Sequence, residues 1–364
     1  MYASPQGEEV PPYPQEAILI GAMSQMSASR ALCTSPGLAQ FAVEAAHAWP
    51  HASVACTYFD LFRASLALKH WPVLPTNVRI ECSIDLADEE VDLVALPLSA
   101  SGEAELTREL IQVGHERLRL GGKLYATTNN PDDTWLRDQL GNIFRKLNHQ
   151  VFPSGVMYVG TKTERLKRVR SFSCEFAFRD CGRLIHAFSR PGVFSHRRVD
   201  AGTRHLMNAM QIGPNARVLD IGCGAGVVSL AAALRAEGVT VHAVDSNARA
   251  IQCTQRGAEL NDLDNLTTEL SAAGRYSGTR TYDMALANPP YYAGFRIAKH
   301  FLAAGREALR PGGRILLVTK RPDWYQQNMP AWYENVTLSE RKGYYVVEGA
   351  CPDDGASVDM VDTL

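Results

Sequence analysis

Short apolar runs alternate with amphipathic stretches along the second half of the chain. The amphipathic stretches at 248–260 and 297–309 repeat apolar residues at helical spacing, and the small-residue run 227–236 also predicts a helix. This alternation is typical of a mostly parallel α/β sheet. The last two strands flank Lys342-Gly343, which predicts a hairpin that closes the sheet with an antiparallel edge strand. The expected strands are Arg217–Ile221, Thr240–Asp245, Leu266–Leu270, Tyr282–Ala287, Arg314–Thr319, Val336–Leu338 and Tyr344–Glu348.

The first half repeats this pattern. At an offset of 191 residues, five groups of residues coincide without a gap over about 40 positions, which indicates a duplicated domain. The coinciding groups are Asp92 with Asp283, Leu118-Arg119 with Leu309-Arg310, Gly121-Gly122 with Gly312-Gly313, Thr128 with Thr319, and Pro131-Asp132 with Pro322-Asp323. Upstream, Val54–Phe59 followed by Asp60 resembles Val241–Val244 followed by Asp245 at a slightly different offset.

A length of 364 residues, 46% of them apolar, fits two domains. We expect a disordered tail over 1–15, a methyltransferase-like first domain over 16–163, a basic linker and domain start over 164–187, the catalytic domain over 188–350 and a C-terminal tail over 351–364. The two copies differ where chemistry is expected. The first has no glycine between Leu38 and Ser101, and it has Pro97 where the second has Asn288. We interpret it as a degenerate, non-catalytic copy.

Charge and cysteine content narrow the function classes. The net charge is −2, yet the segment from Lys162 to Arg204 holds eleven Lys or Arg and four Asp or Glu, which is either a solvated face or a footprint for phosphates. Eight cysteines without a Cys-x-x-Cys pair make a metal site improbable and favour a reduced, cytoplasmic protein. No apolar run is long enough for a membrane helix, and the start lacks a signal-peptide pattern.

A glycine-rich loop follows the first strand of the second half. Gly222, Gly224 and Gly226 permit a tight turn and let a cofactor approach the backbone. Asp245 ends the next strand, where an acidic residue can accept hydrogen bonds from two ribose hydroxyls. A nicotinamide enzyme shares both signals, but its usual G-x-G-x-x-G spacing is missing. Asp220, two residues before the loop, instead fits an S-adenosylmethionine site.

The fourth strand runs into Asn288-Pro289-Pro290-Tyr291, the most specific motif of the chain. Two prolines make the turn rigid because each fixes φ. The Asn288 side-chain oxygen and the Pro289 carbonyl can then converge on a planar amino group, and Tyr291 offers a face for stacking a flat ring. This geometry predicts methyl transfer to an amine by positioning and desolvation, without a strong general base.

The second half resembles the small-domain class I methyltransferases that modify exocyclic or amide nitrogens. The resemblance covers Phe188 to Glu348 and includes Pro191–Ser195, Asp200–Thr203, the glycine loop, Asp245 and Asn288–Tyr291. The Gly-Val-Phe-Ser and Asp-x-Gly-Thr elements, with an inactive first copy, resemble bacterial rRNA guanine-N2 methyltransferases of the RsmC type. The resemblance implies S-adenosylmethionine as cofactor and a rigid segment over it. The implied cofactor set is Asp220, Gly222, Cys223, Gly224, Gly226, Asp245, Ser246, Phe194, Gly202 and Thr203.

Two departures leave the substrate open. The stretch after the third strand, Leu270–Gly274, lacks the acidic or amide residue that such enzymes often use toward adenine, where Ser271 is a weak substitute. Tyr291 replaces the Phe that is more frequent in rRNA guanine enzymes. We expect an RNA base N-methyltransferase whose partner is rRNA or a ribosomal subunit. The alternatives are a protein-glutamine or small-molecule N-methyltransferase and, in another class, a non-catalytic RNA-binding or assembly protein.

Overall fold

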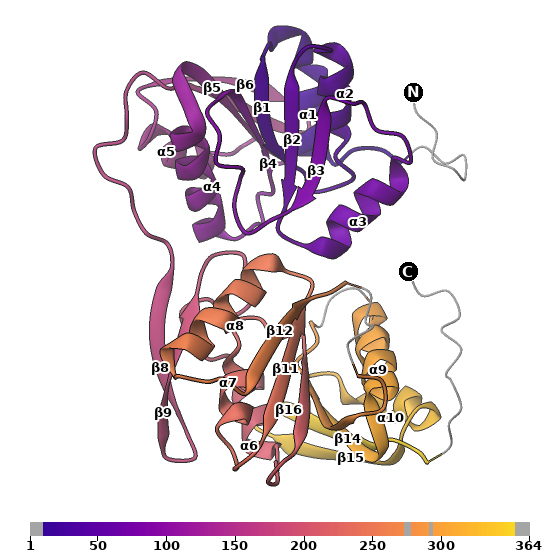
Figure 1. Ribbon diagram of the computed structural model, residues 1–364. Helices are drawn as coiled ribbons and strands as arrows, with labels where there is room; N and C mark the ends of the chain where they lie inside the picture. The colour runs from indigo at the N-terminus through magenta and orange to yellow at the C-terminus, as the bar shows by residue number, and fades with distance from the viewer. Residues whose placement is uncertain (1–9, 273–277, 291–293, 354–364) are drawn as a thin grey trace. The chain divides into compact units, whose positions relative to one another are not determined.

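The computed structural model describes residues 10–272, 278–290 and 294–353. The chain divides into two compact units, the first ending at Phe172 and the second beginning at Ser173. Each unit is a sheet with helices on both faces (Figure 1). Within the described residues, no helix combines the length and the apolar character needed to cross a bilayer.

The N-terminal unit contains a seven-stranded sheet in the order β3-β2-β1-β4-β5-β7-β6. Its strands are β1 Arg30–Thr34, β2 Ser53–Tyr58, β3 Val78–Cys82, β4 Val91–Leu98, β5 Leu118–Thr128, β6 Lys146–Phe152 and β7 Gly155–Thr161. Its helices are α1 Pro14–Gly21, the short 3₁₀ helix η1 Met23–Gln25, α2 Gln40–Ala48, α3 Leu61–His70, α4 Ala104–Arg117 and α5 Trp135–Gly141. Helix α1 begins inside the segment expected to be a tail, and its Gln15 is buried.

The C-terminal unit repeats the order as β12-β11-β10-β13-β14-β16-β15. Its strands are β10 Arg217–Ile221, β11 Thr240–Asp245, β12 Leu266–Leu270, β13 Tyr282–Ala287, β14 Leu309–Thr319, β15 Glu334–Arg341 and β16 Tyr344–Ala350. Its helices are α6 Ala201–Ala209, α7 Val227–Ala233, α8 Ala248–Leu260, α9 Arg296–Ala308, α10 Pro322–Asn328 and the short η2 Met329–Ala331. The sequence thus predicted four of these strands and α8 to the residue.

The expected terminal hairpin is present, with its second strand inside the sheet. Strand β16 pairs antiparallel with β14 on one side and with β15 on the other. The hairpin therefore reverses direction at Lys342-Gly343 and returns between β14 and the edge strand β15. Both residues have positive φ, of 51° and 79°, as a tight reversal requires. The same arrangement of β5, β7 and β6 closes the N-terminal sheet.

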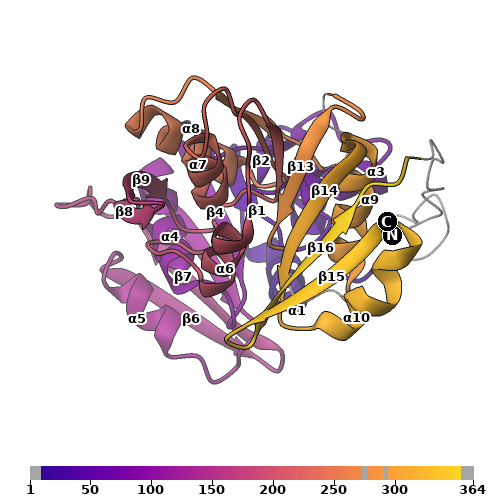
Figure 2. The same ribbon diagram turned by 90° about the horizontal axis from the view of Figure 1, so that it is seen from below.

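Two apolar layers hold the C-terminal sheet. Side chains of α6, α7 and α8, among them Leu206, Leu230 and Ile251, pack on one face. The other face is covered by α9 and α10 through residues such as Leu302 and Tyr325, and Figure 2 shows these two helices across the sheet from the first three. Because the central strands β10 and β13 are covered on both faces, they are nearly continuous apolar runs, which is why the pattern located them well.

The duplication is visible in matching contacts at the amino ends of the strands. Asp92, in β4, accepts a 2.9 Å hydrogen bond from the first backbone N–H of β1 and pairs with Arg119. Asp283, in β13, accepts a 2.7 Å bond from the first backbone N–H of β10 and pairs with Arg310. Residues that coincide in the sequence repeat therefore make the same contact in the two sheets.

The loop after β1 in the N-terminal unit is held closed by side-chain hydrogen bonds. In the loop after β1, the Tyr58 hydroxyl donates a 2.9 Å hydrogen bond to the Gly37 carbonyl, and the Trp71 indole donates a 2.6 Å bond to the Leu38 carbonyl. Ala39 begins α2 in a left-handed conformation, with φ 61°, as Gly226 begins α7 with φ 75°. The turn is therefore retained, while bulky side chains bond its carbonyls.

A buried carboxyl from α1 completes this closure. Glu16 accepts hydrogen bonds from the Ser35 hydroxyl at 3.0 Å and from the Phe41 backbone N–H at 3.1 Å. Its burial raises the pKa of this carboxyl to about 7. In the first unit, an element that precedes the sheet thus contacts the loop at the end of β1.

One expected correspondence between the copies is wrong. The pairing of Thr34 with Thr57, and of Ile221 with Val244, places Tyr58 rather than Asp60 at the strand-end position of Asp245. Asp60 instead caps helix α3 by accepting a 3.0 Å hydrogen bond from the Arg63 backbone N–H. The position of the Asp245 carboxylate is therefore occupied by a phenol in the first copy.

Candidate active site

The glycine loop between β10 and α7 is a backbone turn that needs glycine at three positions. Gly222, Gly224 and Gly226 have φ of 77°, 56° and 75°, values that side-chain-bearing residues rarely adopt. A Cβ at Gly222 would lie 2.9 Å from Phe301, and one at Gly226 2.8 Å from Thr254. At Gly224 the nearest atom, in Phe194, is 3.8 Å away. Gly222 and Gly226 therefore serve close packing, whereas Gly224 faces open space suited to a bound group.

Asp245 joins this loop to the end of β11. Its carboxylate accepts a 2.9 Å hydrogen bond from the Gly224 backbone N–H and a 2.8 Å bond from the Asn247 backbone N–H. Both oxygens are thereby oriented by backbone donors. Ser246 follows in the chain and is half-buried. This arrangement can accept hydrogen bonds from a pair of hydroxyl groups.

Asp220 lies beneath the loop and is almost completely buried. Its carboxyl group accepts a hydrogen bond from the Ser229 hydroxyl on α7. Burial, with a smaller contribution from the nearby negative charge of Asp245, raises the pKa of Asp220 to about 7. Burial likewise raises the pKa of the Cys223 thiol well above its usual value, so that Cys223 is a neutral part of the wall. Asp220 is poised to ionise when a cation binds beside it.

Half of the fourteen predicted residues line one cleft, whereas Gly202, Gly226, Asp245, Ser246, Pro289 and Pro290 lie outside its lining. Phe194, Thr203, Asp220, Gly222, Cys223, Gly224 and Asn288 line it, together with Ser195, Asp200, Ala225, Val227 and Val228. Phe194 is 62% exposed, so that its ring stands at the mouth of the cleft. The geometry thus brings the glycine loop, the segment before the first strand and the Asn-Pro-Pro motif together.

Asn288 is held in one orientation by helix α6. Its amide NH₂ donates to the Thr203 hydroxyl oxygen at 3.1 Å and to the Asp200 carboxylate at 3.4 Å. Asp200 also caps α6 by accepting a bond from the Thr203 backbone N–H at 3.2 Å. Because the nitrogen is occupied, the amide oxygen is the atom that Asn288 can offer as an acceptor.

Gly202 makes this approach possible. A Cβ there would lie 2.9 Å from the Asp200 carboxylate, 3.3 Å from the Tyr344 ring and 3.5 Å from the Asn288 amide oxygen. Pro289 is buried and Pro290 half-buried at the end of β13, as expected for a rigid turn. Tyr291, predicted to stack a flat ring, lies outside the described residues, as do residues 273–277 after Ser271.

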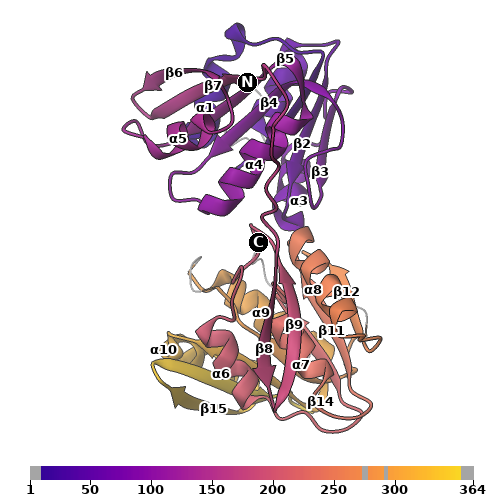
Figure 3. The ribbon, with the colours of Figure 1, turned by 90° about the vertical axis from the view of Figure 1, so that its left-hand side faces the viewer.

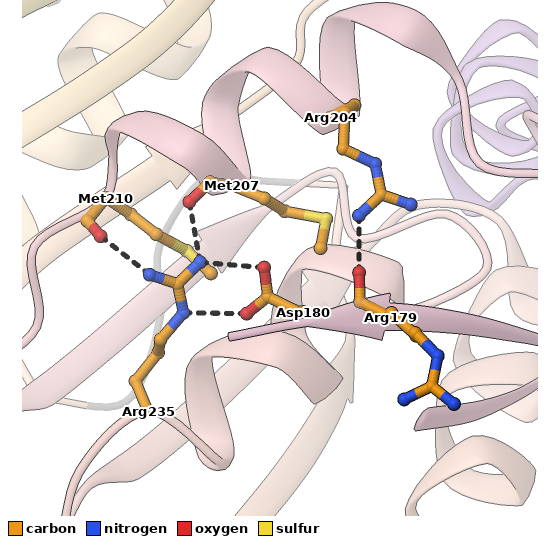
Figure 4. Close-up of polar contacts among 6 residues, drawn as sticks. All are labelled: Arg179, Asp180, Arg204, Met207, Met210 and Arg235. Carbon is orange, nitrogen blue, oxygen red and sulfur yellow. Dashed lines mark hydrogen bonds and ion pairs between the residues drawn. The ribbon is translucent and has the colours of Figure 1, made fainter. Parts of the chain in front are cut away.

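A buried ion pair fixes α6 in place. Arg235, just after α7, bonds both oxygens of Asp180 at 2.8 and 3.0 Å (Figure 4). The same guanidinium donates to the backbone carbonyls of Met207 at 2.6 Å and Met210 at 3.2 Å, at the end of α6. Arg204 on α6 donates to the Arg179 carbonyl at 2.7 Å. The helix that orients Asn288 is therefore tied to the strand that carries Asp180.

That strand belongs to a hairpin in the segment expected to be a linker. Strands β8 Cys174–Asp180 and β9 Arg183–Ser189 form a two-stranded antiparallel sheet. Figure 3 shows the hairpin beside α7 and α8, and Asn261 at the end of α8 bonds the backbone N–H and carbonyl of His186 at 2.9 and 2.6 Å. Part of the predicted linker is thus a structural element of the C-terminal unit.

The basic stretch separates into structural and exposed members. Phosphate binding by Lys162 is a wrong prediction, because this side chain is buried and donates to the Leu118 and Glu116 carbonyls, at 2.5 and 3.1 Å. Arg190 is buried too and bonds Gln252. The exposed cations of the stretch include Arg165, Lys167, Arg168, Arg170, Arg179, Arg183, Arg197 and Arg198.

Several positioning residues were not predicted from the sequence. Asp200 was noted only within a motif, although its spacing to Thr203 is that of a helix cap, which is a readable signal. Ser229 and Arg235 gave no such signal, since their partners, Asp220 and Asp180, are 9 and 55 residues away. Long-range contacts of this kind depend on the fold rather than on local spacing.

The residues present fit S-adenosylmethionine. The chemistry of the donor set suits its three parts: Asp220, buried and close to its ionisation point, suits an ammonium; Asp245 suits ribose hydroxyls; Gly224 leaves its Cβ position open. In the first copy, by contrast, Tyr58 occupies the position of Asp245. Only the C-terminal cleft thus carries this donor set among the described residues.

Comparisons with known proteins agree with this fold. Residues 185–348 match the family described as Methyltransferase small domain. Among solved structures, the 16S rRNA N2 G1207 methyltransferase (RsmC) of T. thermophilus, in complex with AdoMet and guanosine, matches with a TM-score of 0.77 and 19% identity. The match covers 93% of this chain and 92% of that one. The likeness extends over both units, so the chain has the same fold: two tandem Rossmann-like domains.

Curated relatives carry related names. Ribosomal RNA small subunit methyltransferase C of Alcanivorax borkumensis is 28% identical over 68% of this chain and 76% of its own length. The protein of that name from Pseudoalteromonas atlantica is 29% identical, and the match covers 43% of this chain. The chain spans about half the length of that relative, 47%, and matches 92% of the protein YbxB of Bacillus subtilis at 27% identity.

Proposed function

We propose that this protein, in which residues 185–348 form a methyltransferase small domain, is an S-adenosylmethionine-dependent N-methyltransferase. Its substrate is an exocyclic amine of an RNA base, namely guanine N2 of ribosomal RNA. This substrate places the protein in the cytoplasm, with rRNA or a ribosomal subunit as its partner. The N-terminal unit is the non-catalytic copy that holds the substrate RNA.

The orientation of Asn288 carries the proposal. Its amide nitrogen bonds Thr203 and Asp200, so its oxygen is the atom available to accept a hydrogen bond from an incoming amino group. An amine held in this way keeps its lone pair free for attack on a methyl group. Such a side chain, fixed before the substrate arrives, costs no reorganisation in the transition state.

The other site residues divide between cofactor and substrate. When bound, S-adenosylmethionine supplies an electrophilic methyl group. In our assignment, Asp220 binds its ammonium, Asp245 its ribose, and the loop Gly222–Gly226 lies against it. Phe194 at the mouth of the cleft, with Gly202 and Thr203, shields it from water. The cationic donor and the neutral amine need no strong base, which agrees with a cleft wall that contains no histidine among its described residues.

Two observations support RNA over a protein amide or a small molecule. The relatives that match most of this chain are named for ribosomal RNA. In addition, Arg165, Lys167 and Arg168 are exposed within a short stretch, as expected of side chains that neutralise phosphates. A protein-glutamine or small-molecule enzyme has no need of such a stretch.

The test is methyl transfer from labelled S-adenosylmethionine by the purified full-length chain. The acceptors are small ribosomal subunits and naked 16S rRNA from cells that lack the gene, followed by mass spectrometry of nucleosides. We expect N2-methylguanosine to appear. N6-methyladenosine would move the substrate to another base, and binding of the cofactor without transfer to any RNA would contradict the proposed activity.

A further inference from the structure

Two adjacent cations at the carboxyl end of β14 each lie over an aromatic ring. The Lys320 ammonium is 4.6 Å from the centre of the Tyr344 ring. The Arg321 guanidinium carbon is 5.0 Å from the centre of the Phe295 ring. Both cationic side chains are exposed, and neither has a carboxylate partner within ion-pair distance in the described parts of the chain. Both are thus available to an anion from solution.

The rings that support these cations are themselves fixed. Phe295 stacks on Trp324 with ring centres 4.6 Å apart and planes 5° from parallel. Trp324 in turn meets the buried Tyr325 edge-on at 5.0 Å. Tyr344 packs beside His205 at 5.2 Å. Side chains held on such supports lose less conformational freedom when they bind a ligand, so the cations are preorganised.

The two cations lie next to the Asn288 site. Strand β14 pairs with β13 up to Leu317 and Ala287, and Asn288 follows Ala287 directly in the chain. The Tyr344 ring beneath Lys320 and the Asn288 amide oxygen both approach Gly202, at 3.3 and 3.5 Å from its Cβ position. Phe295, beneath Arg321, belongs to the connection that leads from Asn288 into α9. The Tyr344 and Phe295 rings therefore flank the carboxyl end of β14 from two sides.

We propose that Lys320 and Arg321 bind the backbone phosphates that flank the nucleotide presented to Asn288. The inference rests on the proposed function and names two residues for its RNA contact. An enzyme that modifies a base outside its stack must hold the chain on either side of the displaced nucleotide. Cations interleaved with aromatic rings serve this purpose on single strands, because they combine attraction to phosphate with surfaces for stacking. No base-specific contact is required of either residue.

The experiment measures binding of a fluorescein-labelled single-stranded RNA 12-mer to the full chain by anisotropy, as a function of KCl concentration. Lys320→Gln and Arg321→Gln together should lower the slope of log Kd against log salt by about 1.4, since each contact to a single strand contributes about 0.7. The conservative pair Lys320→Arg and Arg321→Lys should keep most of the slope. With rRNA as substrate, the glutamine pair should raise KM and leave kcat within about twofold.

The matched control is Arg256→Gln, which removes one exposed guanidinium from the second half of α8 and should leave the slope unchanged. An unchanged slope in the Lys320/Arg321 double variant, with wild-type RNA binding intact, overturns this inference alone. An equal loss in the control overturns it too, because the effect then follows net charge. If the wild type binds S-adenosylmethionine but no RNA, the proposed substrate fails together with the inference.

Discussion

The Asn288 amide nitrogen lies 3.1 Å from the hydroxyl oxygen of Thr203, a residue that precedes it by 85 positions. The two side chains come from different elements, the end of β13 and the first turn of α6. Their contact decides which atom of the amide faces the cleft. The activity proposed for this site depends on that orientation, because only the oxygen can accept a hydrogen bond from an amine.

Replacing Asn288 by alanine should lower kcat by about 10²–10³, the usual loss when one preorganised polar group is removed from a transition state. Cofactor affinity, measured by calorimetry, should change by less than about twofold. Thr203→Val should lower kcat less, because it frees the amide to rotate, and Thr203→Ser should restore activity. Near-normal kcat in Asn288→Ala on its true substrate would show that a different group positions the nucleophile.

Asp245→Ala should weaken binding of S-adenosylmethionine by about 1.5–3 kcal/mol, the range for losing hydrogen bonds to a charged group. The matched control is Asp264→Ala, which removes an exposed carboxylate near the start of β12. Thermal unfolding has to accompany the calorimetry, since Asp245 also bonds the Gly224 backbone. A folded Asp245→Ala protein with wild-type affinity contradicts the ribose assignment.

Cofactor binding should depend on pH through Asp220. Its pKa is raised to about 7 in the free protein, so at pH 6 the carboxyl is mostly protonated and must lose a proton to pair with an ammonium. Affinity should therefore rise between about pH 6 and pH 7, before an α-amino group with a pKa of about 7.7–8.0 loses much of its own proton. In Asp220→Asn this rise should disappear from calorimetric titrations. A rise of equal size in the variant would assign the titration to another group.

Removing Asp180 should destabilise the C-terminal unit strongly. The ion pair with Arg235 is largely buried, with side-chain exposures of 6% and 13%. Asp180→Ala leaves the guanidinium without its charge partner, which in buried pairs costs about 3–5 kcal/mol. Denaturant unfolding measures this loss. The comparison is Glu175→Ala on the same hairpin, whose exposed pair with Arg256 at 3.7 Å should contribute less than about 1 kcal/mol.

The full chain should bind one S-adenosylmethionine, not two. In the N-terminal unit the Tyr58 hydroxyl bonds the Gly37 carbonyl, and the Trp71 indole bonds that of Leu38, so the turn after β1 is closed by the protein itself. Calorimetry should give a stoichiometry near one, and Asp245→Ala should weaken this single site. A second site that persists in Asp245→Ala would contradict the degenerate assignment of the first copy.

The sequence located the elements of the C-terminal unit better than their connections. Strands β10 to β13 were predicted to the residue, and the central strands β10 and β13 stand out as buried apolar runs, whereas the edge strand β12 is only partly buried. The hairpin β8–β9 was missed because its strands are partly exposed and carry charged residues, so they do not stand out as apolar runs. Its role depends on the long-range contact between Asp180 and Arg235. The residues predicted to contact a ligand lie in local motifs, as do Asp200 and Thr203, which orient Asn288, whereas Ser229 and Arg235 have no local signal.

The correspondence between the copies shows the same limit. Asp60 follows an apolar strand as Asp245 does, and sequence alone equated them. Strand register decides otherwise, because Thr57 pairs with Thr34 and puts Tyr58 at the strand end. A shift of two residues along a strand cannot be resolved without the partner strand.

The two sheets are alike at the amino ends of their strands, where Asp92 pairs with Arg119 and Asp283 pairs with Arg310. They differ at the carboxyl ends. At the amino ends both units have the same Asp–Arg contact. At the carboxyl ends the second unit has glycines and an aspartate, whereas the first has tyrosine, tryptophan and glutamate side chains. The Asp92 contacts at the amino end do not involve the loops at the carboxyl end, so those loops can be replaced without disturbing these contacts. The N-terminal unit is thus a scaffold on which an active centre can be engineered without rebuilding its sheet.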